Sequence, residues 1–362
     1  MGERKAWTAG RRYRRARRLR DSERGVVAVV GTLLALLVFF ALFGIFLTQY
    51  VPLWMTDNES QFSAQGAASF AQLKSDVDLQ YALGGPPKMG VPFTLSSNGV
   101  PLIAAATQGT LDFIPSNCPA QSVTGYGAQV PFYTVAVHPA GTVIGQPVNP
   151  LRCVFTNITI GYGPGSTGIP YYQTVGTGTL SLVLPNRYYT AETYFFEDDG
   201  VIQSQYGGYQ IMSYPPPLNI TSVAGNTTIS TSLLQLYGNS TSVVGQQSQL
   251  VYSQLRYSQF VTSNGKYSPS TQTYAPTNFT FEIGTQYPCA WFSFLKSVVS
   301  GSGLPAAEYS LTQNGTATAP TTAACLNPNS VSTIVELSVT AVVNYVTLFY
   351  AGAQLSVGLG GG

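Results

Sequence analysis

Acidic side chains are the residues of this chain best suited to metal or acid–base chemistry, and they are few. They fall in three short groups: Asp57 with Glu59, Asp76 with Asp78, and the run Glu197, Asp198 and Asp199. Carboxylate oxygens are the ligands that Ca²⁺ prefers, but the spacing of an EF-hand loop is absent. The first two groups are interpreted as solvated helix faces. The third, in "FFEDDGVIQ", is interpreted as a polar hairpin tip around Asp199-Gly200, with a calcium site as the alternative.

No catalytic motif accompanies these acids. The single histidine, His138, lies in "VAVHPAG", where an exposed turn residue is expected rather than a catalytic base. There is no G-x-S-x-G, P-loop, G-x-G-x-x-G or H-E-x-x-H motif. Charged residues make up only 9% of the chain, which leaves few carboxylates for a hydrolase cleft. We expect no enzymatic activity, no cofactor and no metal site. With so few ionisable side chains, the net charge of the part after the apolar segment changes little with pH. This motivates the hypothesis of an acidic habitat.

The chain has four cysteines, all after the long apolar segment at 26–48: Cys118, Cys153, Cys289 and Cys325. An even number of cysteines is typical of disulfides in an oxidising compartment, and four buried thiols are the alternative. Three pairings are open. The spacing favours 118–153 with 289–325, each closing about 35 residues and each contributing about 3–4 kcal/mol in the loop-entropy model.

Sequons of the form N-x-[ST] are more frequent than the Ser and Thr content alone would give. Several lie in turn-like stretches such as "NITSVAGNTT", which suits surface glycan acceptors. The candidate glycosylation sites are Asn58, Asn157, Asn219, Asn226, Asn239, Asn278 and Asn314.

Most of the chain has the pattern of β-strands. From about residue 90, stretches such as "GTLSLVLP", "TNFTFEIG" and "STIVELSVTAVVNYVTLFYAG" alternate apolar and polar residues between Gly, Pro and Asn. The pattern predicts a mainly β protein with an antiparallel β-sandwich ectodomain, as one large sandwich or two. We place a β domain at 90–215, a second domain or continuation at 216–355, with the divide near 213–219, and a flexible glycine-rich tail at 356–362.

Two further helices are predicted beside the strands. Pro52 should kink or end the first helix, the apolar one expected at 26–48. Thr56 with Glu59 then forms a capping box for a membrane-proximal amphipathic helix at 49–85. Its apolar stripe packs on the chain's own β domain or on neighbouring subunits. A short late helix is expected in "PCAWFSFLKSVVSGSG", with Pro288 in its first turn and Gly301 at the C′ position. The stripe consists of Phe62, Gly66, Phe70, Leu73, Val77 and Tyr81.

The segment 26–48 is long enough to cross a membrane. It runs for 23 residues without a charge, and at about 1.5 Å per residue it spans a hydrocarbon core of about 30 Å. No A-x-A site follows it, so we expect a retained transmembrane helix rather than a discarded signal peptide. Residues 1–25 hold ten Lys or Arg against three acids, whereas 26–362 hold seven against twelve. This asymmetry predicts a cytoplasmic leader at 1–25 and an extracellular C-terminal part. The arginine run is better explained by anionic lipid headgroups than by nucleic acid.

The junction of leader and helix resembles a known processing signal. A basic leader ending in Arg24-Gly25, with the apolar helix starting at Val26, resembles the class III signal sequence of archaeal type IV pilin-like proteins. The resemblance implies that a prepilin peptidase cuts between Gly25 and Val26, that the helix stays, and that pilin-like subunits are partners. The leader is longer and richer in arginine than a pilin needs, and the ectodomain is large for a major pilin.

The sequence therefore predicts a single-pass archaeal surface protein of the pilin-like class, with a structural or adhesive function. Its partners would be the lipid bilayer, the peptidase and pilin-like subunits, and surface glycans, but not nucleic acid. The alternative is an anchored extracellular module that binds a solute or a glycan and forms no filament. Both readings share a β-sandwich, so the fold alone does not decide between them.

Overall fold

The structure is a computed structural model that describes residues 29–84, 87–100, 103–115, 155–162, 171–245, 247–264, 276–317, 333–341 and 343–358. The chain forms two compact units. The first comprises Met1–Asp57 with Val100–Ala105, and the second comprises Asn58–Gly99 with Ala106–Gly362. Each unit is described by itself below.

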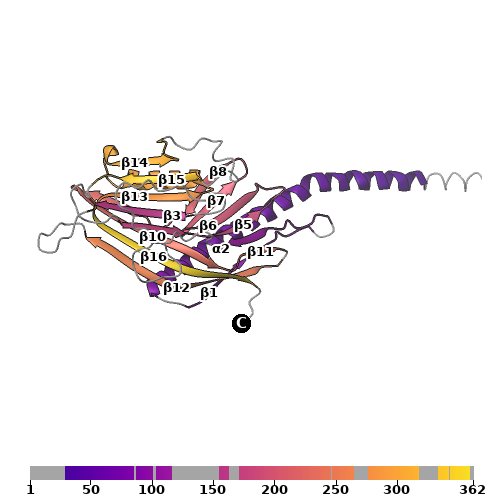
Figure 1. Cartoon of the computed structure of the whole chain (residues 1–362). Helices are drawn as coiled ribbons and strands as arrows, with labels where there is room; N and C mark the ends of the chain where they lie inside the picture. Colours follow the sequence, from indigo (N-terminus) through magenta and orange to yellow (C-terminus); the bar gives the residue numbers. More distant parts are fainter. Residues whose placement is uncertain are drawn as a thin grey trace, which may run out of the picture. The chain divides into compact units, whose positions relative to one another are not determined.

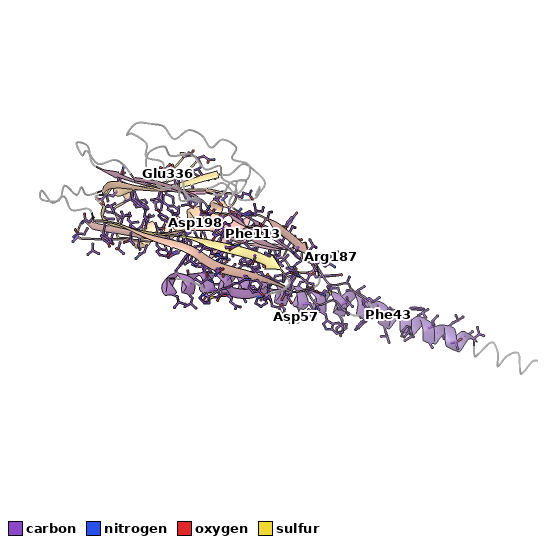
Figure 2. The ribbon with its side chains drawn as sticks, turned by 60° about the horizontal axis from the view of Figure 1, so that its bottom comes forward. Phe43, Asp57, Phe113, Arg187, Asp198 and Glu336 are labelled. Atoms are coloured by element: carbon purple, nitrogen blue, oxygen red, sulfur yellow. The ribbon has the colours of Figure 1, made fainter. Side chains whose placement is uncertain are left out.

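The described part of the first unit is mainly an exposed apolar helix. Helical residues run without interruption from Val29 to Leu83, and none is buried in the most apolar stretch of this helix. By length and composition this is a helix that can cross a membrane, and the side chain of Phe43 stands clear of its ribbon (Figure 2). It is the one such helix in the part of the chain that the structure describes.

Pro52 was predicted to kink or end this helix, and the second alternative is wrong because the helix continues to Leu83. A π-helical turn, η1 (Phe46–Tyr50), immediately precedes α2 (Val51–Leu83). Proline lacks the N–H that would bond to the carbonyl four residues earlier, and its ring crowds that carbonyl, so a widened turn there relieves both problems. The predicted capping box is also wrong. Thr56 lies inside the helix, where its hydroxyl donates to the Pro52 carbonyl at 2.9 Å.

The second unit consists of the α2 residues from Asn58 onward, three sheets and a late helix. Figure 1 labels α2 and most of the strands. The first sheet has the order β1 (Met89–Phe93), β12 (Gln249–Asn264), β16 (Val343–Gly358), β10 (Asn226–Gly238) and β9 (Asn219–Val223). The second has the order β11 (Thr241–Val244), β2 (Thr110–Ile114), β5 (Thr179–Leu184), β6 (Glu192–Glu197), β7 (Gly200–Gln205) and β8 (Tyr209–Tyr214). The third has the order β14 (Tyr309–Gln313), β15 (Thr333–Val339), β13 (Pro276–Thr285), β3 (Phe155–Tyr162) and β4 (Tyr171–Gly176).

The mainly β fold with a long N-terminal helix is as predicted, with three differences. Strands β10 and β16 pair in parallel, whereas the other described ladders are antiparallel. Strands from both sides of 213–219 share each of the three sheets, so the compact units do not divide there. Strand β16 continues to Gly358, into the predicted tail.

The core forms two buried clusters of apolar side chains. In one, the predicted stripe of α2 packs on the chain's own strands, with Phe62, Phe70, Leu73 and Val77 buried among side chains of the first and second sheets. The other surrounds α3 and the third sheet. Strand β10 serves both clusters, since Leu233 belongs to one and Leu234 to the other.

The late helix α3 (Pro288–Gly301) confirms the sequence prediction, including proline in its first turn. Its C-cap is Ser302, and the residue in the left-handed region is Gly303, with φ of 78°. The predicted C′ glycine was therefore placed two residues too early. A 3₁₀ turn, η2 (Ala306–Glu308), leads from this region into β14.

Candidate functional site

The acidic run at the β6–β7 hairpin is the most unusual group of polar residues in the described structure, and it is not an exposed tip. Glu197 pairs with Gly200, so the two turn residues are Asp198 and Asp199, one position earlier than predicted. Their φ values of 44° and 61° are those of a type I′ turn. Glu197, Asp198 and Asp199 are at most 1% exposed. We call these three residues the acidic cluster; Asp198 lies deep among the strands in Figure 2.

Close packing explains why a glycine follows the turn. A Cβ atom on Gly200 would lie 3.0 Å from the Met212 sulfur and 3.2 Å from Cδ of Pro216. The turn signal seen in the sequence therefore reflects tight contact with β8 and the segment after it, in addition to turn geometry.

Glu197 is held by the third sheet and α3. One of its carboxyl oxygens, Oε1, accepts hydrogen bonds from the Trp291 indole N–H and the Thr285 hydroxyl, both at 2.7 Å. The same Thr285 oxygen accepts the Tyr287 backbone N–H at 3.0 Å, where α3 begins. This carboxyl group thus links the hairpin to the start of the late helix.

The two aspartates bind different elements. Asp198 accepts the Thr156 hydroxyl of β3 at 2.7 Å and the Leu234 backbone N–H of β10 at 3.0 Å. Asp199 forms an ion pair with Lys74 of α2, with 3.2 Å between Nζ and Oδ2. Lys74 also pairs with Asp78 one helical turn later, at 3.1 Å. The acidic cluster therefore connects α2 and strands of all three sheets at the junction of the two apolar clusters.

Burial makes these carboxyl groups weak acids, because a charged carboxylate is poorly solvated in an apolar interior. It raises the pKa of Glu197 to about 7, although the Thr285 and Trp291 bonds oppose the shift. It raises the pKa of Asp198 to about 6, against the bonds from Thr156 and Leu234. It raises the pKa of Asp199 to about 8, against the attraction of Lys74. The cluster therefore holds protons in mildly acidic solution and releases them between about pH 6 and pH 8.

The geometry of the acidic cluster fits a structural role. Three nearly inaccessible carboxyl groups have no exposed surface on which to receive a substrate. Among the described residues, no group of three or more His, Cys, Asp or Glu is placed to hold a metal ion, so the calcium alternative gains no support. What the arrangement can do chemically is join elements that are distant in sequence and exchange protons with solvent as the pH changes.

A second buried carboxylate, Glu59, holds a surface connection in place. It accepts the backbone N–H groups of Arg187 at 3.0 Å, Tyr188 at 2.7 Å and Tyr189 at 2.8 Å, and the Thr107 hydroxyl at 2.6 Å. Burial alone would raise the pKa of Glu59, but these four groups outweigh it and lower the pKa below its usual value. Glu59 was interpreted as a solvated capping residue, and that interpretation is wrong.

A third carboxylate lies next to this connection. Glu192 accepts hydrogen bonds from the Ser63 hydroxyl, from the Tyr194 hydroxyl at 2.9 Å and from the Gln205 amide at 2.8 Å. Sequence reasoning did not select it. The available signal was a glutamate at the start of the strand "ETYFFE", on the face that the period-two pattern buries with Tyr194 and Phe196.

The remaining predicted site residues have mixed outcomes. The processing residues Arg24, Gly25 and Val26, the histidine His138, and Cys118, Cys153 and Cys325 lie outside the described residues. Cys289, in α3, is disulfide-bonded, and its partner also lies outside them, so the pairing stays a prediction.

The sequons differ in how they are presented. Asn58 is a poor acceptor, because it lies within α2 and its amide donates to the Asn98 carbonyl at 2.8 Å. Asn157 lies in β3, and the structure does not describe its side chain. The exposed candidates are Asn219, Asn226, Asn239, Asn278 and Asn314. Their glycosylation stays a prediction.

Comparison with known proteins gives no match. No protein-family model, no curated protein and no solved structure is similar to the chain. The resemblance to archaeal pilin-like proteins therefore rests on the sequence alone.

Proposed function

We propose that this chain is a single-pass cell-surface protein of the archaeal type IV pilin-like class. Residues 26–48 anchor it, the basic leader faces the cytoplasm, and the β-rich unit is presented outside the cell with a structural or adhesive role. The observation that carries the proposal is the apolar, unburied helix that begins the described chain directly after a leader rich in arginine. Positive residues beside a first membrane helix stay in the cytoplasm.

The acidic cluster supports a non-enzymatic function. Its carboxyl groups are used in hydrogen bonds and an ion pair that join strands and helices, and burial withholds them from solutes. A surface protein that works by presentation needs a stable domain more than a reactive site. The disulfides, and glycans on the exposed sequons, belong to the same proposal.

The mature N-terminus tests the proposal. Intact-mass and N-terminal peptide mass spectrometry of the protein from native membranes should find a chain that starts at Val26. Gly25→Val should block the cut, whereas Gly2→Val makes the same change away from the junction and should leave it intact. A mature chain that starts at Met1 or Gly2 would contradict prepilin-type processing and remove the reason to expect pilin-like partners.

A further inference from the structure

We propose that one end of the second sheet is a membrane-contact surface, in which Tyr188, Tyr189 and Tyr206 enter the lipid headgroup layer and Arg187 binds lipid phosphate. The inference rests on the proposed anchoring of the chain and specifies where the second unit meets the bilayer. It is carried by the strand registers, by the exposure of the tyrosines, and by the short chain between the apolar helix and Glu59.

The strand registers bring these side chains to one end of the sheet. Leu184 at the end of β5 pairs with Glu192 at the start of β6, and Glu192 pairs with Gln205 at the end of β7. The connection 185–191 and the turn 206–208 therefore leave the sheet side by side. A hydrogen bond from the Tyr206 backbone N–H to the Ala191 carbonyl, at 3.0 Å, joins them.

The tyrosines at this end face solvent to an unusual degree. Tyr206 is 89% exposed, Tyr188 44% and Tyr189 38%. A tyrosine ring has an apolar body and a polar tip, and tyrosine is enriched where a protein meets the membrane–water interface. Three such rings on two adjacent connections fit that interface better than they fit bulk water.

The charge on these two connections fits lipid phosphate. Glu59 and Glu192 are buried and their oxygens accept hydrogen bonds from the protein, so their charges face inward. In the connection 185–191 and the turn 206–208, the one side chain that carries a full charge is Arg187, which is exposed. An arginine beside exposed tyrosines matches a layer of phosphate groups and glycerol esters or ethers. The three backbone bonds to Glu59 fix the connection, so little ordering remains for binding to impose.

The chain itself brings this end to the bilayer. Tyr50 and Trp54 are exposed at the end of the apolar helix, where aromatic residues mark the membrane interface. Glu59 follows Trp54 by five residues. Even a fully extended chain of that length reaches only about 18 Å. Whatever the angle between the two units, the connection bound to Glu59 therefore stays close to the headgroup layer.

A headgroup-quenching experiment tests this contact. The full chain is reconstituted into vesicles of phosphatidylcholine and phosphatidylglycerol, with or without a nitroxide on the phosphatidylcholine headgroup. Trp7→Phe and Trp54→Phe form the background, in which the buried Trp291 contributes the same emission to every variant. The reporter variant is Tyr206→Trp.

The matched control is Val223→Trp, at a position that is 72% exposed. Val223 pairs with Asn226, eight residues before Leu234 on β10, which places it about 27 Å along the strand from the acidic cluster. The acidic cluster is itself at the opposite end of β6 from Glu192. This reporter therefore lies far from the proposed contact.

The proposal expects nitroxide headgroups to quench the added emission of Tyr206→Trp and to leave that of Val223→Trp unchanged. Tyr188→Trp should behave like Tyr206→Trp, and Arg187→Gln should weaken the quenching in vesicles that contain phosphatidylglycerol. Equal, low quenching of both reporters in a chain that floats with the vesicles would overturn the contact and leave the anchoring intact. A chain that does not float would overturn both. A blue-shifted but unquenched Tyr206→Trp would mean that a protein or a carbohydrate covers this end instead.

Discussion

Replacing Asp198 by asparagine should make the second unit more stable at neutral pH and weaken the dependence of its stability on pH. The pKa of Asp198 rises from its ordinary value of 3.8 to about 6 on folding, because the carboxyl group is buried. A group with a raised folded-state pKa contributes stability that is complete below the unfolded pKa and is lost as pH rises through the folded pKa. The loss for Asp198 therefore runs from about pH 4 to pH 7, and it amounts to about 3 kcal/mol.

Asparagine suits this site in geometry as well as in charge. Its amide oxygen can accept the Leu234 N–H in place of Asp198 Oδ1, and its amide group can donate to the Thr156 hydroxyl, which rotates to accept. Asparagine also tolerates the φ of 44° found here. The expected stability of Asp198→Asn is close to that of the unaltered protein at pH 4 and higher by up to about 3 kcal/mol at pH 8.

Urea unfolding of the full chain in detergent, at pH values from 4 to 8, measures the free energy of unfolding of each variant directly. Trp291 reports the transition, because its indole N–H is bonded to Glu197. Asp112→Asn makes the same chemical change at a half-buried position on β2 and should leave the pH slope as it was. Stability that rises from pH 4 to 8, or that falls equally in Asp198→Asn and in the unaltered protein, would refute the reasoning.

Three further outcomes are expected. Lys74→Met removes the ion-pair partner of the buried Asp199, whose pKa is about 8, so it should cost little stability at pH 4, where Asp199 is protonated, and progressively more as the pH rises above 8. The same urea series, extended above pH 8, checks this, and an equal loss at both ends of the pH range would contradict it. Glu59→Gln places amide hydrogens against backbone N–H donors, so it should lower the free energy of unfolding by about 1–3 kcal/mol. Amide hydrogen exchange should become faster at 187–189 but not in β13. Unchanged exchange at 187–189 would show that Glu59 does not hold the connection. Gly238→Ala puts a Cβ 2.3 Å from the Leu355 carbonyl oxygen at a φ of 148°, so it should clearly lower the melting temperature. Gly245→Ala, where a Cβ meets nothing within 4 Å, should leave the melting temperature unchanged. Similar melting temperatures for both variants would argue against the close approach of β10 to β16.

The sequence predicted the helices and strands that bury a single face, because their apolar residues then recur at a regular period. The α2 stripe buries one side of its helix, and α3 does the same after its fully buried start at 288–292. The strands "TLSLVL" and "TNFTFEIG" show the period that one buried face imposes. Strand β10 was missed because it serves two apolar clusters at once. Polar residues such as Thr231, Ser232 and Gln235 are buried there beside leucines, so no alternation survives.

The site was harder to predict, because a charged residue looks the same in a sequence whether it faces water or the interior. Glu197, Asp198 and Asp199 have the sequence of a polar hairpin tip, and only tertiary packing shows that the tip is buried between sheets. Glu59 likewise fitted a capping box, although its partners lie 48 and 128 to 130 residues away along the chain. Local propensity does not encode pairings over such distances.

The position of β16 has a consequence for how the protein is made. It is the last described strand in chain order, yet it lies inside the first sheet, between β12 and β10, and contributes to both apolar clusters. While the chain is being synthesised from its N-terminus, the strands on either side of β16 lack the partner that will join them, and the apolar stripe of α2 has an incomplete sheet to pack on. Productive folding must therefore wait until residues 343–358 have emerged, and until then the strand edges that β16 will join stay unpaired and open to aggregation.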